Sequence, residues 1–216
     1  VLLLDDGSYF LGVGSGYFGD FLGEICFNTS ITGYQEILTD PSYSKQIITF
    51  TFPHIGIVGA NSIDNESSKI HASGCVINQP INLRSSWRSE IDLDFFLTKN
   101  NIACISNIDT RQLTRKLATQ GAIKAAIVNF NVFKKQDLTL NTIDKHSNIV
   151  HEIRKWKGLN NLDLAKIVST QSNYEWSEGI WDLDKNNYTT NQTNKKYKIA
   201  CLDYGIKRNI LRNLHY

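Results

Sequence analysis

The stretch from Asn28 to Gly56 constrains the fold of this chain most, because it combines helix signals, a turn and an apolar run in fewer than thirty residues. Thr32, followed three residues later by Gln35, is a capping box and predicts a short helix that opens near Gly33. One side of that helix is apolar and is formed by Tyr34, Ile37 and Leu38. The stretch therefore predicts a helix with one face in a core.

A turn that presents a serine follows this helix. Asp40 precedes Pro41, and the proline ring disfavours a helical conformation in the residue before it, so the helix ends there. Pro41 suits the second position of a turn, which places Ser42 at the tip. The next residues, QIITFTF, predict a strand that ends before Pro53. Ser42 is thus presented between a helix and a strand. Its hydroxyl either binds a ligand, or the residue serves only to form the turn.

Alternating helical and strand patterns predict an α/β domain in the middle of the chain. The expected elements are helices at Leu93–Lys99 and Thr110–Gln120 and strands at Ile102–Ile105 and Ile123–Val128. Asp109, with Gln112 three residues on, caps the second helix, and Gly121 ends it. Arg111 and Arg115 share one face of this helix, which either contacts an acidic patch on a partner or is only solvated.

The first residues, VLLLDDGSYFLGVG, predict a hairpin that turns at Asp6-Gly7. The segment Gly14–Gly19 then has the form G-x-G-x-x-G. That pattern binds a dinucleotide phosphate when it follows a strand and opens a helix. Here a strand-like segment, EICFNTS, comes next, so we expect a loop or bulge between strands and no cofactor in this chain.

The cysteines and histidines form no recognisable reactive or metal-binding motif. Each cysteine lies in an apolar, strand-like setting without a CxxC pair, at Cys26, Cys75, Cys104 and Cys201. We therefore expect buried free thiols in a reducing compartment, which favours a cytoplasmic location. His54 and His71 have no partner at the spacing of a helical metal pair, so no metal site is predicted.

Charge and hydropathy exclude two classes of partner. The 23 basic and 21 acidic side chains give a net charge of +2, and the basic residues are spread along the chain. Nucleic-acid binding needs a clustered basic face, so we expect no nucleic-acid partner. No apolar run has membrane-spanning length, and Val1 opens without a basic leader or cleavage site, so neither a membrane segment nor a signal peptide is expected.

The composition changes in the last third of the chain. A helix is expected around Ile143–Trp156, and DKNNYTTNQTNKK is expected to be a polar linker. After it, Lys198–Asp203 predicts a buried strand, Gly205 a sharp turn, and Asn209–Tyr216 the start of a helix. Strand, turn and helix in this order are typical of the start of a parallel α/β domain.

Four segments resemble one protein family, in the order in which that family has them. They are NTSITGYQEILTDPSYSKQ, FPHIGIVG, NIDTRQLTRKL and ACLDYGIKRNIL, and they are similar to patterns of the glutamine-using small subunit of carbamoyl-phosphate synthase. The resemblance implies a layered β/β/α N-terminal domain over residues 1–150. A connecting segment and polar linker then occupy residues 151–196, and residues 197–216 form the truncated start of a class I glutamine amidotransferase domain.

The resemblance also implies a function. In this family the small subunit docks on a large subunit, which uses ATP and Mg to make carbamoyl phosphate for pyrimidine and arginine biosynthesis. Ser42 falls where the family places a serine that contacts glutamine. The family's nucleophile is a cysteine in a G-x-C-x-G turn, and none occurs in these residues, so no catalytic residue is assigned and the chain alone is expected not to hydrolyse glutamine. The alternative is a non-catalytic remnant or stand-alone binding module.

Overall fold

A computed structural model describes residues 1–81, 83–129, 147–190 and 197–215. Its centre is a curled, mixed sheet of eight strands in the order β2-β1-β8-β4-β5-β6-β7-β3. Strands β4 to β7 pair in parallel in that order, and every other neighbouring pair is antiparallel. The strand bounds are β1 Leu2–Leu4, β2 Tyr9–Phe10, β3 Val13–Gly16, β4 Phe21–Asn28, β5 Gln46–Phe50, β6 Gly74–Val76, β7 Ala103–Ser106 and β8 Ile123–Ile127.

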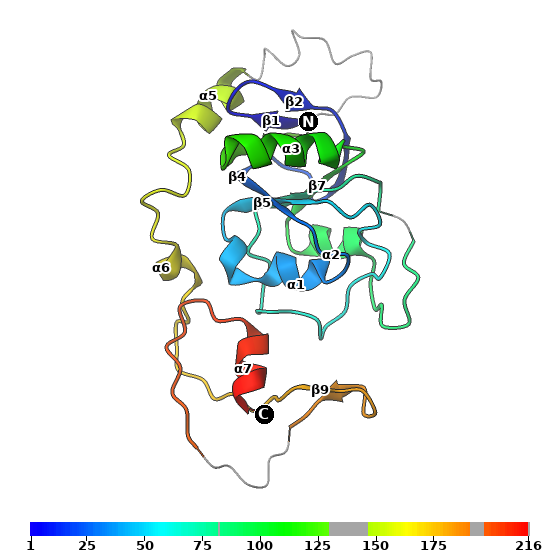
Figure 1. The fold of residues 1–216 in the computed structure, drawn as a ribbon, viewed down its shortest axis with the longest axis vertical. Helices are drawn as coiled ribbons and strands as arrows, with labels where there is room; N and C mark the ends of the chain where they lie inside the picture. The colour runs from blue at the N-terminus through cyan, green and yellow to red at the C-terminus, as the bar shows by residue number, and fades with distance from the viewer. Residues whose placement is uncertain (82, 130–146, 191–196, 216) are drawn as a thin grey trace.

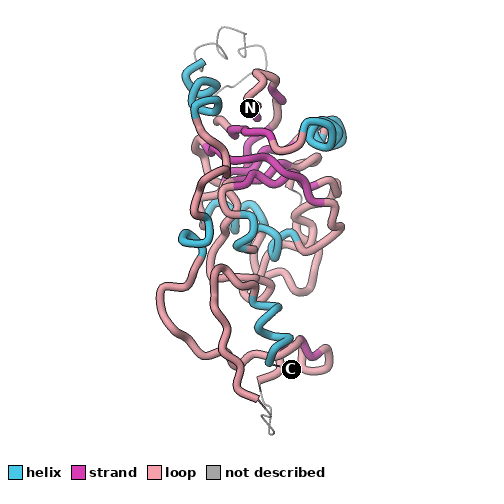
Figure 2. Tube along the Cα trace, turned by 60° about the vertical axis from the view of Figure 1, so that its left-hand side comes forward, coloured by secondary structure: helices cyan, strands magenta, loops and turns pink. Residues whose placement is uncertain are grey.

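Helices cover both faces of this sheet (Figures 1 and 2). Helices α1 (Tyr34–Thr39) and α2 (Leu93–Lys99) pack on one face, where Ile48 is fully buried among their apolar side chains. Helix α3 (Thr110–Gln120) packs on the other face, where Ile47 is fully buried. Both faces of β5 are buried, as is usual for a central parallel strand. The expected α/β class is confirmed.

Several local predictions are confirmed by the element bounds. Helices α2 and α3 begin and end at the predicted residues. Asp109 caps α3 by accepting a hydrogen bond from the Gln112 amide at 2.8 Å, and Gly121 follows its last residue with a φ of 79°. The N-terminal hairpin is also present, with β1 and β2 antiparallel around the Asp6-Gly7 turn. These signals are local, so they survive in the tertiary structure.

The predicted capping box is wrong. The residue before α1 is Gly33, which has a φ of 80°, and no side chain caps this helix. Gln35 is buried and its amide is used elsewhere, because it pairs with the backbone of Asn61. Helix α1 nevertheless ends at Thr39, before the Asp40-Pro41 pair, as predicted.

The glycine-rich segment differs in part from the prediction. Its first three residues form the end of β3, an edge strand that pairs with β7, where a loop or bulge was expected. The segment then leads into β4, so no helix N-terminus follows Gly19. The geometry that a dinucleotide phosphate needs is therefore missing here.

The remaining helices and strands come after residue 146. They are α5 (Ser147–Lys155), α6 (Leu164–Val168), the two-stranded hairpin of β9 (Trp181–Asp182) and β10 (Asn187–Tyr188), and α7 (Arg208–His215). The first residues of the helix expected around Ile143–Trp156 lie outside the described residues. The hairpin occupies part of the segment expected to be a polar linker. Every helix in the described part of the chain is too short or too polar to cross a membrane.

The buried strand predicted at Lys198–Asp203 is wrong. This segment has no regular structure, and most of its side chains are exposed. A strand is stable only when a neighbouring strand pairs with its backbone groups, and no described strand lies beside this one. Cys201, expected to be buried, is exposed for the same reason, whereas Cys75 and Cys104 are buried and Cys26 is half-buried. The turn at Gly205, with a φ of 95°, and the helix after it are present.

Candidate functional site

Ser42 lies at the tip of a tight turn between α1 and β5. The turn is one 3-10 helix, η1 (Pro41–Tyr43), and the Asp40 carboxylate caps it by accepting a hydrogen bond from the Ser42 amide at 2.9 Å. Tyr43 anchors the turn from the side, because its hydroxyl accepts a hydrogen bond from Asn28 at 3.0 Å. Ser42 itself is exposed, and its hydroxyl makes no hydrogen bond to another described residue. The backbone of the turn is therefore fixed, while the exposed hydroxyl is free to contact a ligand.

The second oxygen of Asp40 faces the C-terminal part of the chain. Lys207 Nζ lies 3.3 Å from Asp40 Oδ2, and the lysine side chain is 42% exposed while that of Asp40 is 10% exposed. Asp40 thus makes two contacts at once, one with the Ser42 backbone and one with Lys207. It joins the serine turn to the segment that leads into α7.

A second turn packs directly against the first. Gly205 lies so close to Pro41 and Val168 that an added Cβ would be 3.1 Å from Pro41 Cβ and 2.5 Å from Val168 Cγ2. Asp203 shapes this turn by accepting hydrogen bonds from the amides of Gly205 and Ile206, both at 2.8 Å.

The Asp203 carboxylate is held in its charged form. Partial burial alone would raise the pKa of Asp203, but hydrogen bonds from the Tyr174 hydroxyl and from the two turn amides outweigh burial and lower it. Two turns, one capped by Asp40 and one by Asp203, therefore meet beside Ser42.

Neither Cys26 nor Cys104 is an activated nucleophile. Burial raises the pKa of the Cys26 thiol to about 12. A hydrogen bond with the Cys75 thiol, together with burial, raises the pKa of Cys104 as well. Both groups are held as thiols, whereas a catalytic cysteine reacts as the thiolate. Among the described residues there is also no group of three potential metal ligands.

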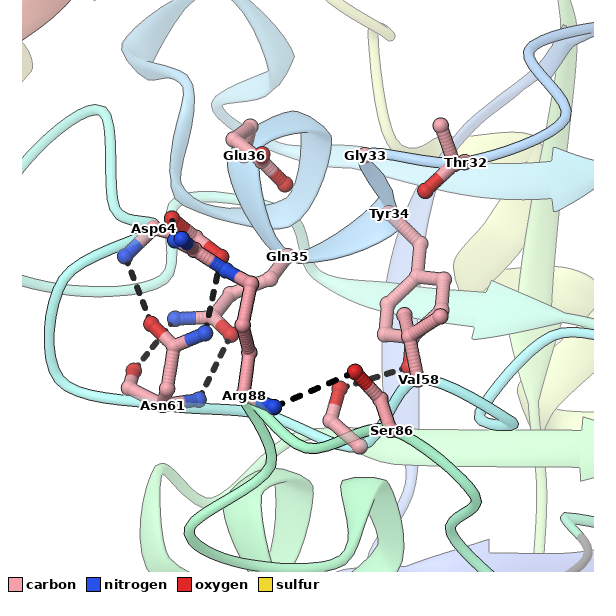
Figure 3. Close-up of a pocket in the computed structure, with 11 residues that line it drawn as sticks. Thr32, Gly33, Tyr34, Gln35, Glu36, Val58, Asn61, Asp64, Ser86 and Arg88 are labelled. Carbon is pink, nitrogen blue, oxygen red and sulfur yellow. Dashed lines mark hydrogen bonds and ion pairs between the residues drawn. The ribbon is translucent and has the colours of Figure 1, made fainter. Parts of the chain in front are cut away.

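A separate cavity of about 140 Å³ lies at the other end of α1 (Figure 3). One wall is a closed polar network in which the Gln35 amide donates to Asn61 O at 2.6 Å and accepts from Asn61 N at 3.0 Å. Asn61 in turn donates to Asp64 at 2.7 Å, and Asp64 pairs with Arg88 at 2.5 Å. The network ties α1 to two loops that are distant in sequence.

Glu36 also faces this cavity and is the least compensated charge in it. Burial raises the pKa of Glu36, and the nearby carboxylates of Asp64 and Glu66 raise it further. A hydrogen bond from the backbone amide of Glu36 and the charge of Arg88 oppose this rise only in part. Asp64 and Arg88 form an ion pair, whereas the Glu36 carboxylate at the cavity wall has no ion-pair partner among the described residues.

The sequence predicted that Ser42 lies at the tip of a turn, as observed, but not that Asp40, Lys207 and Gly205 are the neighbours of that turn. Asp40 was recognised only as a helix end, and Lys207 and Gly205 only as part of a later turn. No local pattern indicates that positions so far apart in the sequence meet. The arginines of α3 lie as the periodicity predicted: Arg111 and Arg115 are exposed on the face opposite the buried leucines.

Comparisons with known proteins identify the chain's relatives. A family model described as carbamoyl-phosphate synthase small chain, CPSase domain, matches residues 2–127. Three curated proteins, each named carbamoyl phosphate synthase small chain, match 99% of the chain. They come from Polynucleobacter asymbioticus, Buchnera aphidicola subsp. Acyrthosiphon pisum and Thioalkalivibrio sulfidiphilus, at 47%, 46% and 44% identity. The match covers 54%, 53% and 53% of those proteins, so the chain spans about half the length of the curated relatives it matches.

Proposed function

The chain belongs to the carbamoyl-phosphate synthase small-chain family, and from that premise we propose that it forms the N-terminal part of the glutamine-using subunit. In this role it docks on a large subunit and contributes one wall of the glutamine site. The observation that carries the proposal is the family match over residues 2–127, which includes the exposed Ser42 turn.

Ser42 is the residue proposed to contact glutamine. Glutamine offers a carboxylate, an ammonium and an amide, and a hydroxyl can hydrogen-bond to each of them. The Ser42 turn supports this role because its backbone is fixed by Asp40 while its hydroxyl stays exposed. Residues 197–216 are proposed as the start of the amidotransferase domain, supported by the Gly205 turn and the helix that follows it.

These 216 residues supply a wall of the site and not its reactive centre. Amide cleavage by this family needs a thiolate at a tight bend, with oxyanion-stabilising amides beside it. None of the four cysteines lies in a G-x-C-x-G sequence, and Cys26 and Cys104 are held as thiols. The ATP- and Mg-dependent steps belong to the proposed large subunit.

The exposed arginines of α3 are the proposed docking face. Arg111 and Arg115 lie on one side of a helix that is well capped and packed by Leu113 and Leu117, so their guanidinium groups are presented from a rigid support. Arginine suits this task because its planar fork binds carboxylates in a bidentate manner.

Size-exclusion chromatography with a large subunit tests docking. The chain is mixed at micromolar concentration with the large subunit of the Polynucleobacter asymbioticus enzyme, and co-elution is expected. The double variant Arg111→Glu with Arg115→Glu should weaken the complex, whereas the matched reversal of two exposed lysines, Lys155→Glu with Lys157→Glu, should not. If the unmodified chain forms no complex, docking fails and the alternative, a remnant or separate binding module, gains support.

A further inference from the structure

The β9–β10 hairpin lies between two arginines that are far apart in the sequence. Arg88 Cζ is 4.4 Å from the centroid of the Trp181 ring, and Arg212 Cζ is 3.6 Å from that of the Tyr188 ring. The two aromatic rings pack edge to face, with centroids 5.1 Å apart. Four side chains therefore form one continuous stack from the Arg88 loop to α7.

Both ends of this stack are anchored by carboxylates. Arg88 pairs with Asp64 at 2.5 Å, inside the polar network below α1. Arg212 pairs with Glu178 at 3.3 Å and is only 4% exposed. The Nε atom of Arg212 is buried and has no hydrogen-bond partner among the described residues, so the face of Tyr188 is a main compensation for burying this charge.

The hairpin cannot be stable by itself, because each strand has two residues and an isolated two-stranded hairpin is marginal in water. Its position therefore depends on the arginines that hold its two rings. Helix α7 is anchored at its start, where the Arg208 amide donates a hydrogen bond to Glu66 O at 2.9 Å, and further along it contacts the hairpin through Arg212. Figure 1 shows α7 and β9 together below α1.

We propose that Trp181 is a positioning residue. The β9–β10 hairpin acts as a strap that Arg88 and Arg212 hold from both sides, and it fixes α7 and the residue before it, Lys207, next to Asp40 and Glu66. Lys207 directly precedes α7, so the strap also holds Lys207 at Asp40 beside the Ser42 turn. Any effect of the strap on glutamine binding near Ser42 rests on the proposed function. The existence of the strap does not depend on that function.

Hydrogen exchange of the full chain tests the strap. In Trp181→Leu, the backbone amides of α7 should exchange several-fold to about tenfold faster, which corresponds to the loss of one cation–π contact. Amides of β4 and β5 should be unchanged. Trp87→Leu is the matched control, because Trp87 is 77% exposed and lies 5.7 Å from the same guanidinium. Trp181→Phe keeps an aromatic face and should restore most of the protection.

A change in α7 should also affect the hairpin, because coupling between two sites is reciprocal. Arg212→Lys keeps the charge but loses the planar face, and it should speed exchange of the hairpin amides at 180–189. Three results would overturn the strap. The exchange rate of the α7 amides could be unchanged in Trp181→Leu, it could rise equally in Trp87→Leu, or the rates could rise uniformly, including those of β4 and β5. The test measures hydrogen exchange and does not depend on glutamine. If the exchange results support the strap while a Ser42 substitution has no effect on glutamine use, only the proposed function is rejected.

Discussion

Asp40 and Lys207 form an ion pair, with Nζ 3.3 Å from Oδ2, and the other oxygen of the same carboxylate caps the turn that presents Ser42. One buried side chain therefore shapes the serine turn and connects it to the C-terminal helix. The ion pair adds to the close packing of Gly205 on Pro41, which links the same two parts of the molecule.

The two contacts of Asp40 can be separated by mutation. Asp40→Asn keeps an oxygen for the Ser42 amide and loses only an ion pair with a partly exposed lysine, so the free energy of unfolding should fall by a few tenths of a kcal/mol. Asp40→Ala also removes the cap and should cost about 1 kcal/mol more. Urea unfolding of both variants measures the difference, and equal losses would show that the cap contributes nothing.

Gly205 should tolerate a side chain far less well than another glycine with similar backbone strain. Gly205→Ala adds a Cβ 2.5 Å from Val168 Cγ2 at a φ of 95°. Gly121→Ala has a φ of 79° but open space around its Cβ, so it carries the strain of about 1 kcal/mol without the clash. We expect limited proteolysis to release α7 faster in the first variant only. Equal cleavage in the two would contradict close packing at Gly205.

Glu36→Gln should stabilise the protein at neutral pH. The pKa of Glu36 is raised in the folded state, chiefly by burial, so folding disfavours its charge above that pKa. As the pH falls through the raised pKa, the carboxyl becomes neutral in the folded state and the advantage of the variant shrinks. Below the ordinary value of 4.5 the carboxyl is neutral in the unfolded state as well, and the advantage should disappear.

The measurement is the urea midpoint of Glu36→Gln between pH 7 and pH 4, with Glu175→Gln, at an exposed position, as control. A higher midpoint at pH 7 that converges with wild type near pH 4 is expected for Glu36→Gln alone. A variant that is less stable at pH 7 would show that the charge is stabilising.

The purified chain should not release ammonia from glutamine. It offers no cysteine in a G-x-C-x-G sequence, and the raised pKa values of Cys26 and Cys104 keep both groups protonated at pH 7. An ammonia-release assay with the isolated chain checks this, and the same assay on the Cys201→Ser variant controls for the exposed thiol. Turnover above background that disappears in Cys201→Ser would identify a reactive centre where we assign none.

Predictions from the sequence are correct for elements whose signals are local. They are wrong where contacts with residues distant in the sequence determine the structure. Asp109 and Gly121 fixed the ends of α3 because a cap and a left-handed glycine act within one turn of helix. The position of Gln35 suggested a helix cap, but its side-chain amide hydrogen-bonds to the backbone of Asn61 instead. The segment Lys198–Asp203 has the composition of a strand, yet among the described residues it has no strand to pair with.

The candidate site shows the same division. Ser42 could be predicted because proline and the residue before it impose a turn on their own. The contacts around the turn, Asp40 with Lys207 and Pro41 with Gly205, depend on how the C-terminal part folds back on α1. No periodicity in the chain encodes that contact, and the same is true of the Asp64–Arg88 pair in the cavity.

The most direct test of the proposed glutamine wall is the KM for glutamine in an assembled enzyme. Residues 1–216 replace the matching half of the Polynucleobacter asymbioticus small chain, which is paired with its large subunit. Ser42→Ala should raise the KM for glutamine about five- to tenfold, the effect of one lost hydrogen bond, while the rate with added ammonia stays unchanged. Ser30→Ala, at another exposed serine, should leave both unchanged. A KM in Ser42→Ala equal to that of the unmodified chimera would contradict the account.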